Sequence, residues 1–234
     1  MAHLNRLAIP KSWPISKKKT KWITRPNPGP HPLREALPLN ILVRDILKYA
    51  KTNKEVKTIL NASKILINKV ARNDIHFPIG LMDVVEIPET KEQFRIIYNK
   101  KGQFKLLKID EKETNLKPLK IAGKKIIKGK KLQLNLSDGR NIIVAKDDYK
   151  VKDVVIFNLK ENKIVEKLRL EKGAAVYIVD GKYKGAHGKV KEVILTGNEQ
   201  PDKITFEHNG TEHVTLAKYA YVIGKEKPII KIEE

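Results

Sequence analysis

Lysines and arginines gather at the beginning of this 234-residue chain, where their charge suits a polyanion. The first 34 residues contain no Asp or Glu, and the first acid is Glu35. The basic residues of this segment are Arg6, Lys11, Lys17, Lys18, Lys19, Lys21, Arg25 and Arg34. No residue of the segment can neutralise this charge, and its prolines prevent it from folding alone. It therefore requires a large anionic surface to lie against, and nucleic acid is the usual one.

The composition of the whole chain points the same way. Its 48 Lys and Arg residues outnumber 27 Asp and Glu residues, which gives a formal net charge of +21. Ordinary domains carry net charges of only a few units, so solubility alone does not account for this excess. Each cation placed at a phosphate releases a counterion, and affinity should therefore fall steeply with salt. We expect no membrane partner, because no apolar run approaches the roughly 18 residues of a membrane helix.

Side chains that could perform catalysis or hold a cofactor are sparse. The chain has no cysteine, which excludes disulfides and thiol chemistry and favours a reducing, cytoplasmic setting. Its histidines are scattered and have no paired carboxylates beside them, so they do not form a metal site; they are His3, His31, His76, His187, His208 and His213. We expect no enzymatic activity, no cofactor and no small-molecule substrate.

The elements that must position the basic residues fall into four regions and a short tail at residues 225–234. Residues 1–38 are predicted to form an irregular, extended arm, because the proline-rich run at 26–32 forbids helix and central strand. Trp13 and Trp22 both lie in this arm. They either fix the arm to the protein's own core or stack on RNA bases or sugars. His31, set among prolines, is a candidate to hydrogen-bond RNA.

The second region, residues 39–92, begins with a helical period. Its apolar face consists of Leu39, Leu42, Val43, Ile46, Leu47 and Ala50. Three cations, Arg44, Lys48 and Lys51, fall on the opposite face. Thr52 and Glu55 are spaced as a capping box and start a second helix.

A small β element completes this region. Residues 65–73 are predicted to form a strand, a turn and a strand, and residues 83–87 form another apolar strand. Two short helices followed by a small β element, with basic residues along one side, resemble the S4 RNA-binding module. The resemblance adds Lys69 and Arg72 to the candidate RNA contacts.

Residues 93–170 are dominated by strand signals. Phe94 and Ile96 alternate with polar residues before a turn at 99–102. Leu132, Leu134 and Leu136 alternate into Ser137-Asp138-Gly139-Arg140, and Asp-Gly between two such runs is a strong hairpin signal. We expect a packed β domain whose lysines face outward, with no chemistry of its own.

Residues 171–224 form a basic unit rich in glycine and β-branched residues. Gly181, Gly185 and Gly188 bracket a tight loop, because glycine allows positive φ and close backbone approach. The candidate RNA contacts on this loop are Lys182, Tyr183, Lys184, His187 and Lys189. The pattern resembles a KOW motif, part of a small SH3-like barrel. A nucleotide-binding loop is not favoured, because no Gly-Lys-Ser/Thr ending is present.

The ordered set of an arm, an S4 module, a β domain and a KOW unit resembles the S-four-e family of archaeal and eukaryotic small-subunit ribosomal proteins. The stretches that match include His3-Leu4-Asn5-Arg6-Leu7, Pro28-Gly29-Pro30-His31, Val43-Arg44-Asp45-Ile46-Leu47, Pro78-Ile79-Gly80-Leu81-Met82-Asp83-Val84, Ser137-Asp138-Gly139-Arg140-Asn141-Ile142 and Tyr221-Val222-Ile223-Gly224. The compact length is similar to the archaeal form. The predicted fold class is multidomain α+β.

The resemblance implies a structural role without catalysis. A member of this family binds and stabilises small-subunit rRNA and has other small-subunit ribosomal proteins as neighbours. Two departures from the family pattern stand out. Asn68-Lys69-Val70 replaces the common Asp-Gly-Lys, so the backbone is expected to turn differently there, whereas Arg72 matches its family position. Lys17-Lys18-Lys19 stands where an Arg is often found, which keeps charge but loses the bidentate grip on phosphate.

Other functions remain open at this point. An S4 module also occurs in RNA-modifying enzymes and in RNA-binding factors that act outside the mature ribosome. Such enzymes need a catalytic domain of a couple of hundred residues, and only residues 93–170 are spare here. KOW units occur in transcription elongation factors, which need a polymerase-binding domain instead of an S4-like module. A DNA-compacting protein would show little preference for RNA over duplex DNA at matched salt.

Overall fold

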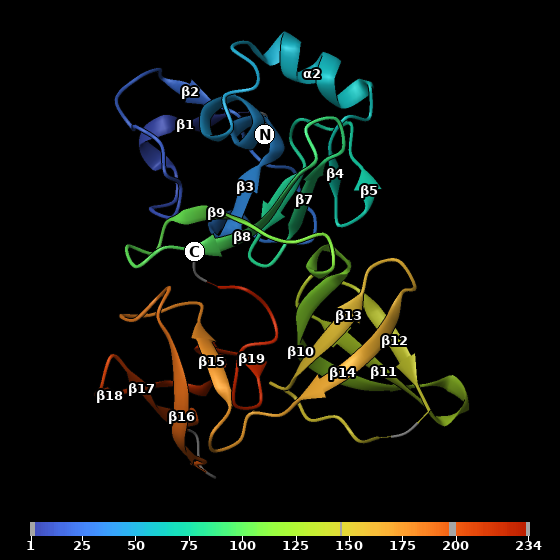
Figure 1. The fold of residues 1–234 in the computed structure, drawn as a ribbon, viewed down its shortest axis with the longest axis vertical. Coiled ribbons are helices and arrows are strands. Elements are labelled where there is room, and N and C mark those ends of the chain that lie inside the picture. The colour runs from blue at the N-terminus through green and yellow to red at the C-terminus, as the bar shows by residue number, and fades with distance from the viewer. Residues whose placement is uncertain (1–2, 146, 197–199, 233–234) are drawn as a thin grey trace. The chain divides into compact units, whose positions relative to one another are not determined.

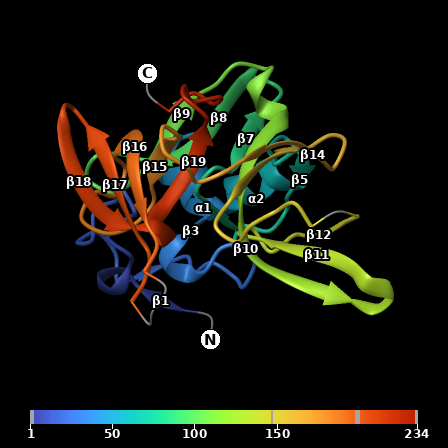
Figure 2. The ribbon, with the colours of Figure 1, turned by 90° about the horizontal axis from the view of Figure 1, so that it is seen from below.

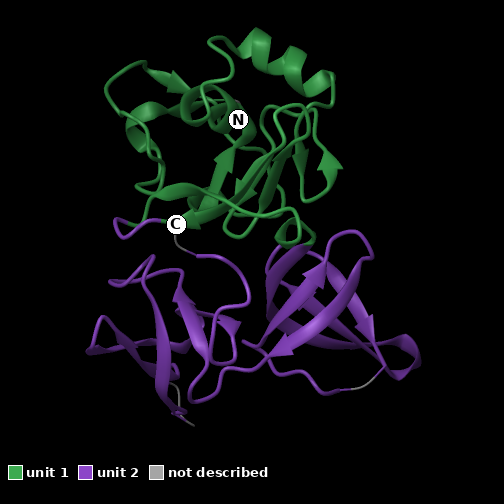
Figure 3. Ribbon diagram, viewed as in Figure 1, with its two compact units in different colours: residues 1–98, 102–115 green, residues 99–101, 116–234 purple. Residues whose placement is uncertain are grey.

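The computed structural model describes residues 3–145, 147–196 and 200–232, and these are mostly β-strands with few helices (Figures 1 and 2). The chain divides into two compact units (Figure 3). Unit 1 consists of residues 1–98 and 102–115, and unit 2 of residues 99–101 and 116–234. The described part contains no helix long and apolar enough to cross a bilayer.

The arm of unit 1 contains more regular structure than the sequence predicts. Its elements are β1 (Leu4–Asn5), the 3-10 helices at Arg6–Ala8 and Leu33–Glu35, and β2 (Trp22–Ile23). β1 and β2 pair antiparallel, with Leu4 opposite Ile23. The run at 26–32 has neither helix nor strand, which confirms the effect expected of its prolines. Proline thus breaks this stretch, while the residues before it remain free to pair.

One tryptophan fixes the arm to unit 1 and the other faces outward. Trp13 is 2% exposed, and its indole Nε1 donates a hydrogen bond of 2.8 Å to the carbonyl of Ala36. Ile9 and Ile23 are buried as well. Trp22 is 53% exposed. Trp13 therefore fixes the arm to the core of the protein. Trp22 lies at the surface, where it is accessible for stacking.

The helix expected from residue 39 is shorter than its hydrophobic period suggests, and most of it is a π-helix. α1 (Leu39–Ile41) continues into a π-helix at Leu42–Ile46, where the amide of Leu47 donates to the carbonyl of Leu42 at 2.9 Å. Lys48 has a φ of 59°, so the chain leaves the helix before residue 48. Leu39, Leu42 and Val43 are fully buried and form the apolar face. The helical period expected through Ala50 and Lys51 was wrong as a continuous helix, because a left-handed backbone at Lys48 cannot continue a right-handed helix.

The capping box at the second helix is confirmed. α2 (Asn53–Asn61) begins after Thr52, whose Oγ1 accepts a hydrogen bond of 3.3 Å from the amide of Glu55. The Glu55 carboxylate in turn accepts a hydrogen bond of 2.8 Å from the amide of Lys51 and one of 3.0 Å from the hydroxyl of Thr52. The amide of Glu55 in the first turn and the amide of Lys51 just before the N-cap are thereby satisfied.

A five-stranded sheet forms the core of unit 1, in the order β5-β4-β7-β8-β9. Its strands are β4 (Leu66–Ile67), β5 (Val70–Ala71), β7 (Val84–Ile87), β8 (Glu92–Tyr98) and β9 (Phe104–Lys108). A separate pair joins β3 (Ala36–Pro38) to β6 (Pro78–Gly80). β8 pairs with β7, so residues 93–108 belong to this sheet and not to the sheet that follows. The break between compact units comes after Asn115 instead of after residue 92.

The first sheet of unit 2 has the order β12-β11-β10-β13-β14. Its strands are β10 (Leu116–Ile127), β11 (Lys131–Leu136), β12 (Asn141–Val144), β13 (Val154–Asn158) and β14 (Lys163–Leu168). The Asp138-Gly139 turn joins β11 to β12, with Gly139 at a φ of 81°, and this confirms the predicted hairpin. Leu132, Leu134 and Leu136 are buried, as their alternation predicts.

The second sheet of unit 2 has the order β18-β17-β16-β15-β19. Its strands are β15 (Ala175–Ile178), β16 (His187–Ile194), β17 (Lys203–His208), β18 (Thr211–Leu216) and β19 (Ala220–Gly224). Gly188 is required by a close approach, since a Cβ there would lie 2.0 Å from the carbonyl oxygen of Glu207. The two sheets of this unit contact each other through Tyr221, whose hydroxyl donates 2.7 Å to the carbonyl of Pro118.

Candidate nucleic-acid interface

A basic groove of about 880 Å³ runs over unit 1 and joins two parts of the sequence. Residues of the arm form one side and residues of the first helix and its exit form the other. The lining residues are Arg6, Lys19, Thr20, Trp22, Ile23, Thr24, Arg44, Asp45, Lys48, Ala50, Lys51 and Asn53. We call this the basic groove. It brings together Lys19, Arg44, Lys48 and Lys51, which the sequence places in two separate candidate sites.

Arg6 is buried beneath the arm side of the groove and holds it in place through hydrogen bonds. Its side chain is 4% exposed, with Nε donating 2.6 Å to the carbonyl of Ser16 and Nη1 donating 2.9 Å to the hydroxyl of Thr20. Its own amide donates 2.9 Å to the carbonyl of Lys21. These bonds hold the loop that carries Lys19, so Arg6 positions the groove wall instead of presenting a free guanidinium.

The opposite wall combines a fixed cation with two exposed ones. The Arg44 guanidinium donates 2.7 Å to the Asp45 carboxylate and 2.5 Å to the amide oxygen of Asn53, which fixes its plane. Lys48 and Lys51 are exposed, and Lys48 has a positive φ just after the chain leaves the helix. Asp45 offsets the charge of Arg44, so the lysines carry most of the positive potential.

Trp22 adds an aromatic face to this charge. The Lys21 ammonium lies 5.3 Å from the centre of its ring, and the His3 ring lies 5.6 Å away. Proteins that bind single-stranded nucleic acid commonly place an exposed aromatic ring beside several cations. Bases stack on the ring, and the phosphates contact the cations. The groove is therefore suited chemically to an RNA strand.

Comparison with known proteins gives the family of this chain. Residues 2–34 match the RS4NT domain and residues 90–164 match the Ribosomal family S4e. The small ribosomal subunit protein eS4 of Methanosphaera stadtmanae is 42% identical over 230 residues, which cover 98% of this chain and 95% of that protein. This chain belongs to the eS4 family. The eS4 protein of Archaeoglobus fulgidus is 38% identical over 233 residues, covering 98% of this chain and 97% of that protein.

A solved structure has the same fold. The crystal structure of the 30S ribosomal protein S4e from Thermoplasma acidophilum superposes with a TM-score of 0.70 at 26% sequence identity. The match covers 82% of this chain and 96% of that one. The mostly β fold with few helices is thus an eS4-like fold.

Among the candidate contacts of this eS4 family member, His31 lies in the core of unit 1. Its Nε2 is 2.9 Å from the Asp83 carboxylate, and that carboxylate also accepts 2.8 Å bonds from the amide of Gly80 and the side-chain amide of Asn68. A Cβ on Gly80 would lie 2.4 Å from the His31 ring. The matched Pro28–His31 and Pro78–Val84 stretches therefore contact each other, which no sequence spacing reveals.

Lys69 and Arg72 also have partners within unit 1. Asn68 and Lys69 have φ values of 50° and 67°, the geometry of a type I′ turn, so the chain turns tightly without glycine. The Lys69 ammonium lies 2.7 Å from the Glu86 carboxylate and 3.1 Å from the Thr114 hydroxyl. The Arg72 guanidinium lies 4.6 Å from the centre of the Phe77 ring. Their charge is thus partly used inside the protein.

The remaining cations of the arm do not line the groove. Lys11, Lys17, Lys18, Lys21 and Arg34 are exposed. Arg25 is half-buried, and its carbonyl accepts 2.7 Å from the imidazole of His76. Of the exposed lysines, Lys17, Lys18 and Lys21 lie within two residues of the lining residue Lys19 in the chain, so they can approach an RNA strand in the groove.

The glycine loop of unit 2 presents charge beside a stack of rings. Lys182 and Lys189 are exposed, Lys184 and His187 are half-buried, and the Lys182 ammonium lies 5.5 Å from the Tyr183 ring. The Tyr183 ring stacks on His213 at 4.4 Å. Sequence reasoning missed His213, because only the pairing of β17 with β18, which sets His213 opposite Phe206, brings it here.

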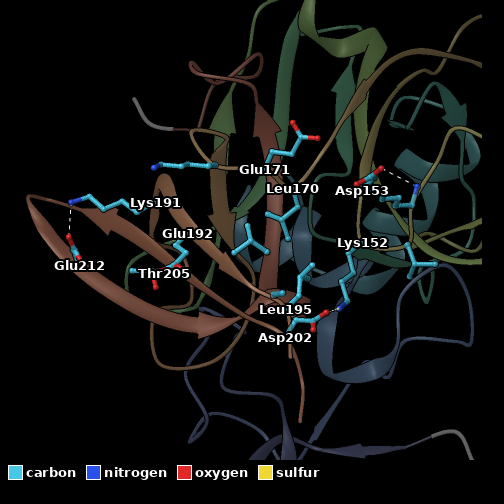
Figure 4. A pocket seen from close by; sticks show the side chains of 15 residues that line it. Lys152, Asp153, Leu170, Glu171, Lys191, Glu192, Leu195, Asp202, Thr205 and Glu212 are labelled. Atoms are coloured by element: carbon cyan, nitrogen blue, oxygen red, sulfur yellow. Dashed lines mark hydrogen bonds and ion pairs between the residues drawn. The ribbon is translucent and has the colours of Figure 1, made fainter. Parts of the chain in front are cut away.

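A second hollow, of about 810 Å³, lies in unit 2 and differs in charge (Figure 4). Lys191 bridges Glu212 at 2.7 Å and Glu207 at 3.3 Å, and these carboxylates raise its pKa. Lys152 pairs with Asp202, and that hydrogen bond lowers the pKa of the Asp202 carboxyl. Five acids and four lysines line this hollow, so it suits a polyanion less well than the basic groove. Within the described residues, no cluster of His, Cys, Asp or Glu could hold a metal ion.

Proposed function

We propose that this chain is a structural component of the small ribosomal subunit and that its basic groove binds and stabilises the subunit's rRNA. The observation that carries the proposal is that one groove is lined by Lys19 and Trp22 of the arm together with Lys48 and Lys51. Proteins named small ribosomal subunit protein eS4 match 98% of this chain, which supports a role in translation. Cytoplasmic ribosomes are the setting that follows from it.

The groove binds RNA without rearranging, because its walls are built into unit 1. Arg6 fixes the lysine-bearing loop, Trp13 packs the arm on the core and Asn53 orients Arg44. A preformed site loses less conformational entropy on binding than a free arm would. Phosphates meet the lysines, and an unstacked base lies against Trp22.

The glycine loop at residues 181–189 is the second attachment to rRNA. Binding at one attachment raises the effective concentration of the other, so the whole chain binds more tightly than either part. We assign the arm (1–38), an S4-type module that begins at residue 39 and shares its sheet with β8 and β9, a central β domain built on β10–β14 and ending at residue 170, a KOW unit (171–224) and the tail (225–234) as its modules. Neighbouring small-subunit proteins are its other partners. Membranes, small-molecule substrates, cofactors and catalysis have no part in this role.

An S4-bearing factor that acts outside the mature ribosome is not favoured. An RNA-modifying enzyme of that kind carries a catalytic domain beside its S4 module. The relatives that match this chain over nearly its whole length are named as ribosomal proteins, and 95% or more of their own length is covered.

Competition binding tests the proposal. Small-subunit rRNA should retain the protein in the presence of excess duplex DNA at matched salt. Combining Lys19→Gln, Lys48→Gln and Lys51→Gln should lower affinity about tenfold or more and flatten the dependence of log K on log salt by roughly 2 to 3, because each phosphate contact contributes about 0.7 to 0.9.

The matched control combines Lys112→Gln, Lys160→Gln and Lys163→Gln. These lysines are exposed and have no ion-pair partner among the described residues. The control removes the same charge away from the groove and should leave the salt dependence nearly unchanged. Equal competition by duplex DNA, or equal losses in the two triple variants, would contradict the proposal.

A further inference from the structure

The turn between β10 and β11 carries a second concentration of positive charge, in a region where the sequence indicated no chemistry. Five lysines lie within eight residues: Lys124, Lys125, Lys128, Lys130 and Lys131. The sequence has no Asp or Glu between Glu113 and Asp138. We call residues 124–131 the lysine hairpin.

Strand register makes this hairpin extend beyond its own sheet. β10 pairs with β13 only from Leu116 to Lys120, and after a bulge at Ile121/Gly123 it pairs with β11 alone. The pairing of β11 with β12 ends at Leu132. Figure 2 shows the turn of this hairpin pointing away from the other strands of the sheet. Both faces of the tip are therefore open to a partner.

Four of the five lysines are exposed and have no acidic partner among the described residues: Lys125, Lys128, Lys130 and Lys131. The fifth, Lys124, pairs with Asp147 and donates 2.6 Å to the carbonyl of Tyr149. Some lysines elsewhere in unit 2 are paired, as in Lys117–Asp138 and Lys191–Glu212. Those without an acidic partner in the described part of the chain, such as Lys160, Lys163 and Lys172, are not gathered on one turn as these four are. Unpaired cations gathered on one tip repel each other, and a polyanion relieves that repulsion.

We propose that the lysine hairpin binds the phosphate backbone of double-stranded RNA, at a site separate from the basic groove. The hairpin has no aromatic side chain on which an unpaired base could stack, so it recognises backbone shape instead of sequence. Ile126 is 72% exposed beside the lysines and meets the apolar face of sugars. A narrow two-stranded ribbon reaches across the wide, shallow minor groove of an A-form helix.

This inference rests on the proposed ribosomal function, and its first test separates the two. Combining Lys125→Gln, Lys128→Gln, Lys130→Gln and Lys131→Gln should reduce the salt slope for small-subunit rRNA by about 3 and the affinity by tenfold or more. The matched control combines Lys112→Gln, Lys160→Gln, Lys163→Gln and Lys172→Gln, which removes the same charge from exposed, unpaired positions. Melting curves should show all variants folded.

The outcomes divide clearly when the variant of the basic groove is measured in parallel. If the groove variant loses affinity while the hairpin variant equals its control, the hairpin inference is overturned and the proposed function stands. If the wild-type chain shows no preference for rRNA over duplex DNA, the proposed function fails and the hairpin inference fails with it. Binding of the wild type, but not the hairpin variant, to anionic vesicles in place of RNA would also overturn the inference.

The absence of cysteine allows a direct second test. Ile126→Cys, labelled with a tethered iron–EDTA group and assembled into subunits, keeps every lysine and should cleave both strands of one rRNA helix across its minor groove. Val165→Cys, at an exposed residue of β14, is the matched label and should give a different cleavage pattern. Cleavage confined to unpaired RNA, or none from Ile126→Cys, would contradict binding to a duplex.

Discussion

At the scale of single residues, the two tryptophans of the arm have different surroundings. Trp13 is buried and gives its indole proton to the backbone of Ala36, whereas Trp22 is half-exposed beside Lys21. Both have the same residue type and lie in the same proline-rich segment. Their surroundings assign one to the core and the other to the basic groove.

Substitution of Trp13 should therefore lower stability, whereas substitution of Trp22 should lower the affinity for RNA. Trp13→Ala should cost about 3 to 5 kcal/mol of unfolding free energy, because a buried ring and its hydrogen bond are lost. Trp22→Ala should leave stability nearly unchanged and weaken rRNA binding by about 1 to 3 kcal/mol through lost stacking. Trp22→Phe should restore much of the binding. Denaturant melts and RNA titrations on the same preparations measure both quantities, and equal RNA affinity of Trp22→Ala and wild type would argue against stacking.

At the scale of elements, the β11–β12 hairpin depends on a buried ion pair. Lys117 of β10 is 1% exposed, and its ammonium lies 3.3 Å from the carboxylate of Asp138 in the hairpin turn. Arg140 adds a contact of 3.2 Å to the same carboxylate and lies 5.2 Å from the Phe157 ring. The turn therefore has two sources of stability. Asp-Gly favours the turn locally, and the Asp138 carboxylate also pairs with Lys117, which is distant in the sequence.

Asp138→Ala should destabilise unit 2 by about 3 to 5 kcal/mol, because it leaves the Lys117 ammonium buried without its carboxylate. The matched variant Asp147→Ala removes an acid that is largely exposed and pairs with Lys124, and it should cost less than about 1 kcal/mol. Guanidinium unfolding followed by circular dichroism measures both. A cost for Asp138→Ala as small as that of Asp147→Ala would show that the buried pair contributes little.

At the scale of the whole molecule, Lys120 joins the two sheets of unit 2. Its ammonium donates 2.8 Å and 2.7 Å to the carbonyls of Lys218 and Ala220, about a hundred residues away in the sequence. Burial, with a smaller contribution from the charge of Lys152, lowers the pKa of Lys120 from 10.5 to about 8. A neutral amine still has two protons for these two carbonyls.

The depressed pKa predicts a stability that rises with pH. Below pH 8 the folded protein must keep a buried charge, and between about 8 and 10.5 only the unfolded chain retains this proton. The unfolding free energy should therefore increase from pH 8 toward 10. Lys120→Met should flatten this rise, whatever its overall cost, while the exposed control Lys163→Met should keep it. Denaturant melts from pH 7 to 9.5 measure the slope, and equal slopes in wild type and Lys120→Met would contradict the assignment.

Local features of this protein were predictable from its sequence. The acid-free basic arm, the Thr52–Glu55 capping box, the Asp138-Gly139 hairpin and the buried alternation of β11 all follow from neighbouring residues. Each depends on backbone preferences or side-chain periods within a few positions of the chain. The order of these features was enough to indicate the family.

Only the tertiary structure decided which cations share a site. It joined Lys19 to Lys48 and Lys51 in one groove, turned Lys69 toward Glu86 and placed His31 against Asp83. It also carried the lysine hairpin beyond its sheet, through the register of β10 with β13 and β11. Contacts of this kind depend on strand register and on the packing of distant elements, because a shift of one residue turns a side chain to the opposite face.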